Sequence, residues 1–221
     1  MTMAGRPPDV PPTRLDVDRI DSIEIGLEWA VASRPHPDET AMGDGAVCRP
    51  LDEGWLLAVM DGLGHGAGAD EARAVASSVI TALASHDLAT LVQMCHRRLQ
   101  ATRGVALAAA YLAVDRTVTW TGVGNIEGLV LRPEGGRWRV GRRLTSVAGV
   151  VGYHLPRVRL ESFELGDADV LVLHSDGVAG DVATVSTQGT LDALADATLA
   201  RFARPDDDAL VLLARTIADD R

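Results

Sequence analysis

The chain has 221 residues, of which 47% are apolar, and a formal net charge of −10. This length suits one large domain with a sizeable core, while the acidic balance argues against a protein held on nucleic acid by phosphate contacts. No apolar run approaches the roughly 18 residues of a membrane-spanning helix, and the N-terminus lacks a signal-peptide pattern. Cys48 and Cys95 have no metal-binding spacing. We therefore expect a cytoplasmic protein with reduced thiols and no membrane segment.

The N-terminal third begins with four prolines within residues 1–19, which predict a flexible tail and a single domain over residues 20–221. Alternating apolar residues predict a strand over 22–34, followed by a polar loop that runs to Gly43. The next two segments, "DGAVCRP" and "GWLLAVMD", read as a strand pair joined by the acidic turn "LDEG".

Two helices are predicted next, roughly over residues 67–85 and 87–101, and the first is rich in alanine, which favours helix and close packing. Beyond them, four segments with tight turns between them read as successive antiparallel strands, namely "GVALAAAYLAVD", "TVTWTGVGN", "EGLVLRP" and "RWRVGR". A strand near 157–164, the buried strand "DVLVLHSDG", a helix from about 189 to 203 and the strand "DDALVLLAR" complete the chain. The order predicts an α+β sandwich, in which two antiparallel sheets are flanked by helices.

The most distinctive segment is residues 55–80, in which an apolar strand ends at Asp61 and a glycine-rich turn leads into a helix. A turn of this kind presents backbone N–H groups to an anion. A carboxylate at position 61 would repel a phosphate unless a cation lay between them. The segment therefore indicates a metal ion that in turn holds a phosphate.

Four aspartates share this context at predicted strand ends. Asp61 and Asp176 each end an apolar strand and precede a glycine, whereas Asp44 and Asp207 each open a strand. Each Asp-Gly pair alone is more often a simple turn, but a rigid sheet can aim several strand-end side chains at one point. Carboxylate and carbonyl oxygens are the ligands that Mg²⁺ and Mn²⁺ prefer, and the Gly62 carbonyl can join them because glycine lets the backbone come close.

Five segments, "ETAMGDGAV", "LLAVMDGLGHG", "TGVGNIEG", "LVLHSDGV" and "RPDDDALVLLA", occur in the order and approximate spacing of a known family. On these motifs the chain resembles the SpoIIE-like branch of the metal-dependent (PPM) Ser/Thr protein phosphatases, over about residues 22–217. Within that branch it is most similar to the stand-alone phosphatases of stressosome-type signalling.

The resemblance implies a PPM-type αββα sandwich with two Mg²⁺ or Mn²⁺ ions at one end of the sheets. It implies that Asp61 bridges both ions, that Asp176 and Asp207 complete one, and that Asp44 and the Gly62 carbonyl complete the other. It also implies hydrolysis of phosphoserine or phosphothreonine by an activated water, on STAS-domain or stressosome-type protein substrates.

The last motif departs from the family pattern and leaves one ambiguity. Leu210 stands where the family usually has threonine. This difference affects the expected packing around the site and leaves the expected ligands unchanged. The run Asp206-Asp207-Asp208 leaves the ligand open by one residue, and we choose Asp207 from its place before the apolar strand.

Several single residues allow two interpretations. His65 either donates a proton to the leaving oxygen or caps the following helix. His174 points to the same side as Asp176 and is expected to be buried beneath the site. Asn125 in "GVGN" has a turn role or a functional one, and Arg103 either contacts phosphate or is structural.

The sequence also contains partial matches to two other functional motifs. Gly64, Gly66 and Ala69 fit a dinucleotide-binding pattern, but Asp61 would face the pyrophosphate and the strands after the helices read as antiparallel. In addition, no acid stands at the end of a suitable second strand about 20 residues on. "LHSDG" is not a nucleophile elbow, because Leu173 replaces the required glycine. A non-catalytic module of the same fold that binds a phosphoprotein remains the alternative to an enzyme.

Overall fold

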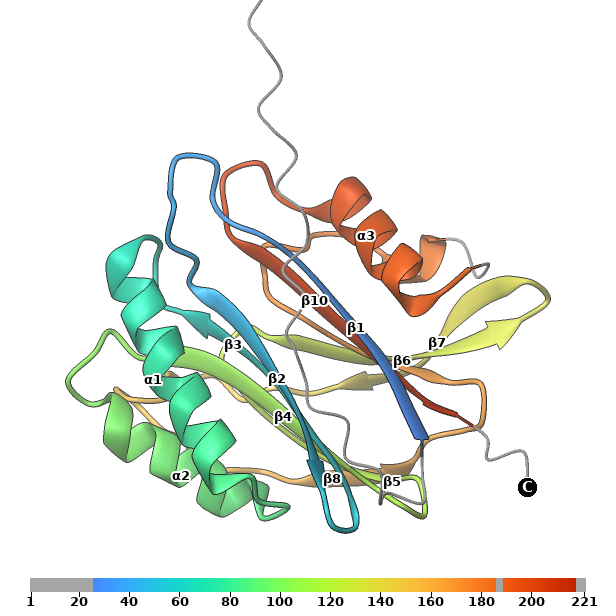
Figure 1. Ribbon diagram of the computed structural model, residues 1–221, viewed down its shortest axis with the longest axis horizontal. Coiled ribbons are helices and arrows are strands. Elements are labelled where there is room, and N and C mark those ends of the chain that lie inside the picture. The colour runs from blue at the N-terminus through green and yellow to red at the C-terminus, as the bar shows by residue number, and fades with distance from the viewer. Residues whose placement is uncertain (1–25, 186–188, 218–221) are drawn as a thin grey trace, which may run out of the picture.

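The computed structural model describes residues 26–185 and 189–217, so the predicted tail and the start of the first predicted strand lie outside the described residues. The described residues form two five-stranded sheets, all of whose strand pairs are antiparallel (Figure 1). The first sheet has the order β1 (Gly26–Arg34), β10 (Ala209–Ile217), β9 (Val170–His174), β6 (Glu127–Glu134) and β7 (Arg137–Leu144). The second has the order β2 (Asp44–Leu51), β3 (Gly54–Gly62), β4 (Val105–Ala113), β5 (Thr117–Val123) and β8 (Glu161–Glu164).

Helices cover the outer face of each sheet. Helices α1 (Ala67–Leu83) and α2 (Leu88–Leu99) pack on the second sheet, while α3 (Leu191–Phe202) and the short 3₁₀ helix η1 (Val182–Thr184) cover the first (Figure 1). A third apolar cluster, which includes Trp120, fills the space between the sheets. The predicted αββα arrangement of an α+β sandwich is confirmed, and no described helix is long and apolar enough to cross a bilayer.

The structure corrects one detail of the strand prediction. The four strands after α2 form two hairpins, β4–β5 and β6–β7, that belong to different sheets. The chain crosses between the sheets at Gly124, whose φ of +98° favours glycine, and Ile126 is buried in the cluster between them. Both sheets bury apolar side chains, so alternation alone does not reveal this crossing.

Helix α1 lies unusually close to the end of β3. Its inward side is lined by Ala69, Ala72 and Ala76, whose small side chains let the helix approach the sheet. A Cβ at Gly62 would lie 2.2 Å from the carbonyl oxygen of Ala69, so the Asp-Gly pair that ends β3 requires glycine for this packing.

Both cysteines are buried and unpaired, as expected for structural thiols. Burial raises the pKa of the Cys95 thiol to about 12 and that of Cys48 further.

Candidate metal centre

The structure brings all four predicted aspartates to the same end of the sandwich. Asp44 opens β2 and Asp61 ends β3, and the two are directly paired in the antiparallel ladder. Asp176 follows β9 and Asp207 precedes β10, which are neighbours in the first sheet. The two sheets meet here through the main chain of Gly43, whose N–H donates to the Asp208 carboxylate at 2.7 Å.

The burial and crowding of these carboxylates raise the pKa of three of them. Burial, followed by the charges of Asp176 and Asp207, raises the pKa of Asp61 from 3.8 to about 7. Burial and then the charge of Asp61 raise the pKa of Asp44 well above its usual value, and burial and the charge of Asp176 raise that of Asp207. Carboxylates that repel one another in a partly desolvated pocket favour a bound cation.

Ser175 is a member of the site that the sequence prediction missed. Its hydroxyl donates to Asp44 Oδ2 at 2.6 Å and accepts from the Leu210 N–H at 3.0 Å, and the residue is fully buried. Ser175 therefore ties the end of β9 to β10 and holds Asp44 of the other sheet. The available signal was a serine at the end of a strand that is otherwise apolar. Leu210, in place of the family's threonine, puts its side chain into the core between the sheets.

Asn125 is drawn into the site by the crossing between the sheets. Its Nδ2 donates to Asp176 Oδ2 at 2.6 Å. Of the two interpretations of Asn125, the geometry favours the functional one, because its side chain holds a candidate ligand in place.

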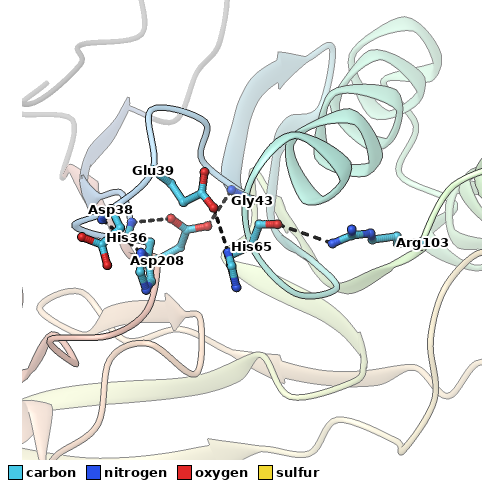
Figure 2. A network of polar contacts seen from close by, with 7 residues as sticks. All are labelled: His36, Asp38, Glu39, Gly43, His65, Arg103 and Asp208. Atoms are coloured by element: carbon cyan, nitrogen blue, oxygen red, sulfur yellow. Dashed lines mark hydrogen bonds and ion pairs between the residues drawn. The ribbon is translucent and has the colours of Figure 1, made fainter.

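The three consecutive aspartates have different surroundings. Asp206 is exposed, Asp207 is half-buried, and Asp208 is buried. Both carboxylate oxygens of Asp208 accept main-chain N–H groups of the loop between β1 and β2, from His36 and from Gly43, each at 2.7 Å (Figure 2). Asp208 thus anchors this loop, whereas the pKa of Asp207 is raised by burial and by the charge of Asp176.

His65 lies in the glycine-rich turn at the rim of the site. Its Nδ1 is 3.0 Å from Glu39 Oε1, and its ring stacks on His36 at 5.2 Å between centroids (Figure 2). The cap of α1 is Gly66, with no side-chain cap, so the alternative in which His65 caps the helix is wrong. Arg103 donates to the His65 carbonyl at 3.4 Å, which supports its structural interpretation.

His174 is buried beneath the site, as predicted. Its Nδ1 lies 2.9 Å from the Ser175 carbonyl, and burial lowers its pKa.

The donor set fits hard divalent cations. Carboxylates and main-chain carbonyls supply only oxygen, as Mg²⁺ and Mn²⁺ require. Within the described residues, no three His, Cys, Asp or Glu side chains enclose a single point by themselves. Waters would complete the coordination of any bound ion, as is common for Mg²⁺.

Comparisons with known proteins agree with this geometry. The family model described as Stage II sporulation protein E (SpoIIE) matches residues 51–217. Phosphoserine phosphatase RsbX of Bacillus subtilis (strain 168) is 28% identical over 94 residues, which are 42% of this chain and 47% of RsbX. The chain thus spans about half the length of this curated relative in the match.

Two solved structures share the whole sandwich. One, described with the bacterial stressosome as a modular system adapted to control secondary messenger signalling, has a TM-score of 0.77 and 27% identity over 86% of this chain and 100% of its own. RsbX in complex with magnesium has a TM-score of 0.76 and 19% identity over 88% of this chain and 96% of its own. The expected PPM-type fold and the resemblance to the SpoIIE-like branch are confirmed.

Proposed function

Because this chain belongs to the SpoIIE family, we propose that it is a metal-dependent phosphatase that hydrolyses phosphoserine or phosphothreonine on small signalling proteins. The observation that carries the proposal is the group of four aspartates at one end of the two sheets, where burial and mutual repulsion raise the pKa of Asp61 to about 7. Such a group of carboxylates is a poor site for a phosphate by itself and a good one for divalent cations that hold a phosphate.

Two Mg²⁺ or Mn²⁺ ions are proposed. Asp61 would contact both, Asp176 and Asp207 one of them, and Asp44 with the Gly62 carbonyl the other. When bound, such ions neutralise phosphoryl charge and make a water nucleophilic at neutral pH. The magnesium complex of RsbX supports this choice of metal.

The side chains around the aspartates have positioning and proton-transfer roles. Ser175 and Asn125 fix Asp44 and Asp176 by hydrogen bonds of 2.6 Å. His65 is the proposed proton donor to the leaving serine or threonine oxygen. When both of its ring nitrogens carry protons, Nδ1–H donates to Glu39 and Nε2–H is the donor for the leaving group.

The proposed substrates are phosphorylated STAS-domain or stressosome-type proteins, in the cytoplasm. Support comes from RsbX, which is named as a phosphoserine phosphatase, and from the structure described with the bacterial stressosome. One domain over residues 20–221 would carry this activity.

The first test is turnover of p-nitrophenyl phosphate and of a phosphoserine peptide, with Mn²⁺, with Mg²⁺ and with EDTA. We expect hydrolysis only with a divalent cation. Binding of the phosphopeptide without turnover in any metal would contradict the enzyme and favour the non-catalytic module.

The three consecutive aspartates give a matched set of variants. We expect Asp207→Asn to lower kcat with p-nitrophenyl phosphate by roughly a hundredfold or more, because a ligand of a catalytic ion is lost, and to raise the metal concentration needed for half activity. Asp206→Asn is the control and leaves turnover unchanged, since that side chain is exposed.

Asp208→Asn should behave differently from both. An amide can accept only on one oxygen, so one of the two N–H contacts from the loop is lost, and we expect a lower melting temperature together with lower activity. A loss of metal affinity in Asp206→Asn with none in Asp207→Asn would show that the ligand assignment is off by one residue.

A further inference from the structure

Positive charge is concentrated in one part of this acidic chain. Residues 135–160 contain six arginines and no aspartate or glutamate, although the whole chain has a net charge of −10. The chain has 21 arginines and no lysine. The planar guanidinium forms paired hydrogen bonds with carboxylates, which an ammonium does not.

The fold collects four of these arginines along one border of the sandwich. Strand β7 is the edge of the first sheet and β8 the edge of the second, on the side opposite to β1 and β2. Figure 1 shows the β6–β7 hairpin extending away from α1 and α2. Arg142 of β7 lies over the ring of Phe163 in β8, with its Cζ 4.9 Å from the ring centroid, and so joins the two edges. Four exposed arginines are here called the arginine rim, namely Arg142 and Arg143 of β7 and Arg157 and Arg159 of the segment before β8. Arg137 and Arg139, farther along β7, and Glu164 of β8 are also exposed.

The arginine rim reaches the candidate metal centre through a cavity. A cavity of about 470 Å³ has Asn125, Glu127, Arg143, Ser146 and Asp176 among its lining residues. A second cavity, of about 550 Å³, is lined by Val147, the residue after Ser146, and by Arg157 and Arg159. A chain whose phosphorylated side chain lies at Asp176 can therefore continue past Arg143 toward Arg157.

Few carboxylates of the described residues lie close enough to the arginine rim to neutralise its charge. Glu127 Oε2 lies 4.0 Å from Arg143, at the limit of an ion pair, and both side chains are about two-thirds exposed. Glu161 lines the second cavity beside Arg159. Among the described residues, neither Arg157 nor Arg159 has a carboxylate within ion-pair distance.

We infer that the arginine rim docks an acidic segment of the phosphoprotein substrate, next to the phosphorylated side chain. The inference rests on the proposed function, whose site it extends. A protein segment is favoured over nucleic acid, since the rest of the chain is strongly acidic and would repel a long polyanion. Charge complementarity at such a rim gives substrate choice and faster encounter more than raw affinity.

The first experiment measures binding rather than turnover. The probes are fluorescein-labelled peptides with a central serine, unphosphorylated, flanked either by glutamates or by glutamines, and the readout is fluorescence anisotropy at low and at high salt. We expect the glutamate peptide to bind more tightly, and its advantage to shrink at high salt. A triple variant with Arg143→Gln, Arg157→Gln and Arg159→Gln should bind the glutamate peptide roughly tenfold more weakly, because each exposed arginine–glutamate ion pair contributes about a few-fold in affinity.

Two further variants sharpen the test. Arg49→Gln is the matched control, since Arg49 is an exposed arginine on β2, the edge strand at the opposite border, and it should leave binding unchanged. Glu127→Gln should strengthen binding of the glutamate peptide, because it removes the carboxylate that competes for Arg143. Equal binding of the two peptides by the wild-type protein would overturn the inference, as would tighter binding of a single-stranded oligonucleotide.

Turnover then separates this inference from the proposed function. With phosphoserine versions of the peptides, the ratio of kcat/KM for the glutamate peptide to that for the glutamine peptide should fall in the triple variant and stay constant in Arg49→Gln. If the protein hydrolyses p-nitrophenyl phosphate and this ratio is one, docking of an acidic segment at the arginine rim is wrong and the proposed phosphatase activity is supported. If nothing is hydrolysed, the proposed phosphatase activity is wrong, and the anisotropy experiment still tests whether the arginine rim binds an acidic segment.

Discussion

Asp61→Asn is expected to abolish metal-dependent phosphatase activity, with a loss of roughly a thousandfold or more in kcat. Asp61 is paired with Asp44 across the β2–β3 ladder and is repelled by Asp176 and Asp207, so it is the carboxylate common to both halves of the site. Asparagine has nearly the same shape but no charge, and one of its two oxygens is replaced by an N–H donor group. The measurement is steady-state turnover of p-nitrophenyl phosphate over a titration of Mn²⁺.

The same variant separates a catalytic effect from unfolding. Without metal, Asp61→Asn removes one charge from a crowded group, so its melting temperature in EDTA should be at least that of the wild type. Asp206→Asn, an exposed acid of the same kind, serves as the activity control. Metal-dependent turnover within about tenfold of the wild type would contradict the assignment of Asp61.

The second large effect is a pH-dependent loss of stability in the metal-free protein. The pKa of Asp61 is about 7 in the folded protein and 3.8 in a free side chain. The folded protein therefore holds a proton that the unfolded chain releases, and the free energy of unfolding falls as the pH rises from about 4 to about 7. We expect a loss on the order of a few kcal/mol, and the raised pKa values of Asp44 and Asp207 act in the same direction.

Divalent cations should reverse this trend. Ions bind the ionised carboxylates of the folded protein, so the stabilisation by Mg²⁺ or Mn²⁺ should be largest above pH 7, at about 2.7 kcal/mol for each hundredfold excess over Kd. Urea unfolding in EDTA and in Mg²⁺ between pH 5 and 8 measures both effects.

His174 opposes this fall in the free energy of unfolding at the lower end of the pH range, and Asp61→Asn is the control variant. His174 is buried with a lowered pKa, so it destabilises the fold as the pH falls below its usual value of 6.5. Asp61→Asn should flatten the dependence between pH 5 and 7. The same pH dependence in the wild type and in Asp61→Asn would show that the carboxylates do not repel one another as the structure indicates.

The sequence alone could predict the local features of the site. The apolar strands that end at Asp61 and Asp176 and the glycine-rich turn before α1 are visible as continuous patterns, because strand alternation and turn chemistry depend on near neighbours. Asp44 and Asp207 could be placed at strand starts for the same reason, and the family motifs then gave all four a common role.

The contacts that hold the aspartates in place came only from the tertiary structure. Ser175 bonds to Asp44 across 131 positions of the chain, and Gly43 bonds to Asp208 across 165. Asn125 reaches Asp176 only because the chain crosses between the sheets after β5. None of these pairs leaves a periodic trace in the sequence, since each needs one side chain and one distant partner.

The sequence by itself therefore determined the sandwich, the four acidic strand ends and the glycine at position 62. The tertiary structure decided which of the three consecutive aspartates anchors a loop, which hairpin belongs to which sheet, and where the arginines of residues 135–160 gather. Strand pairing brings distant segments together at one end of the sandwich, and charges act on each other over those distances in space whatever their separation in the chain.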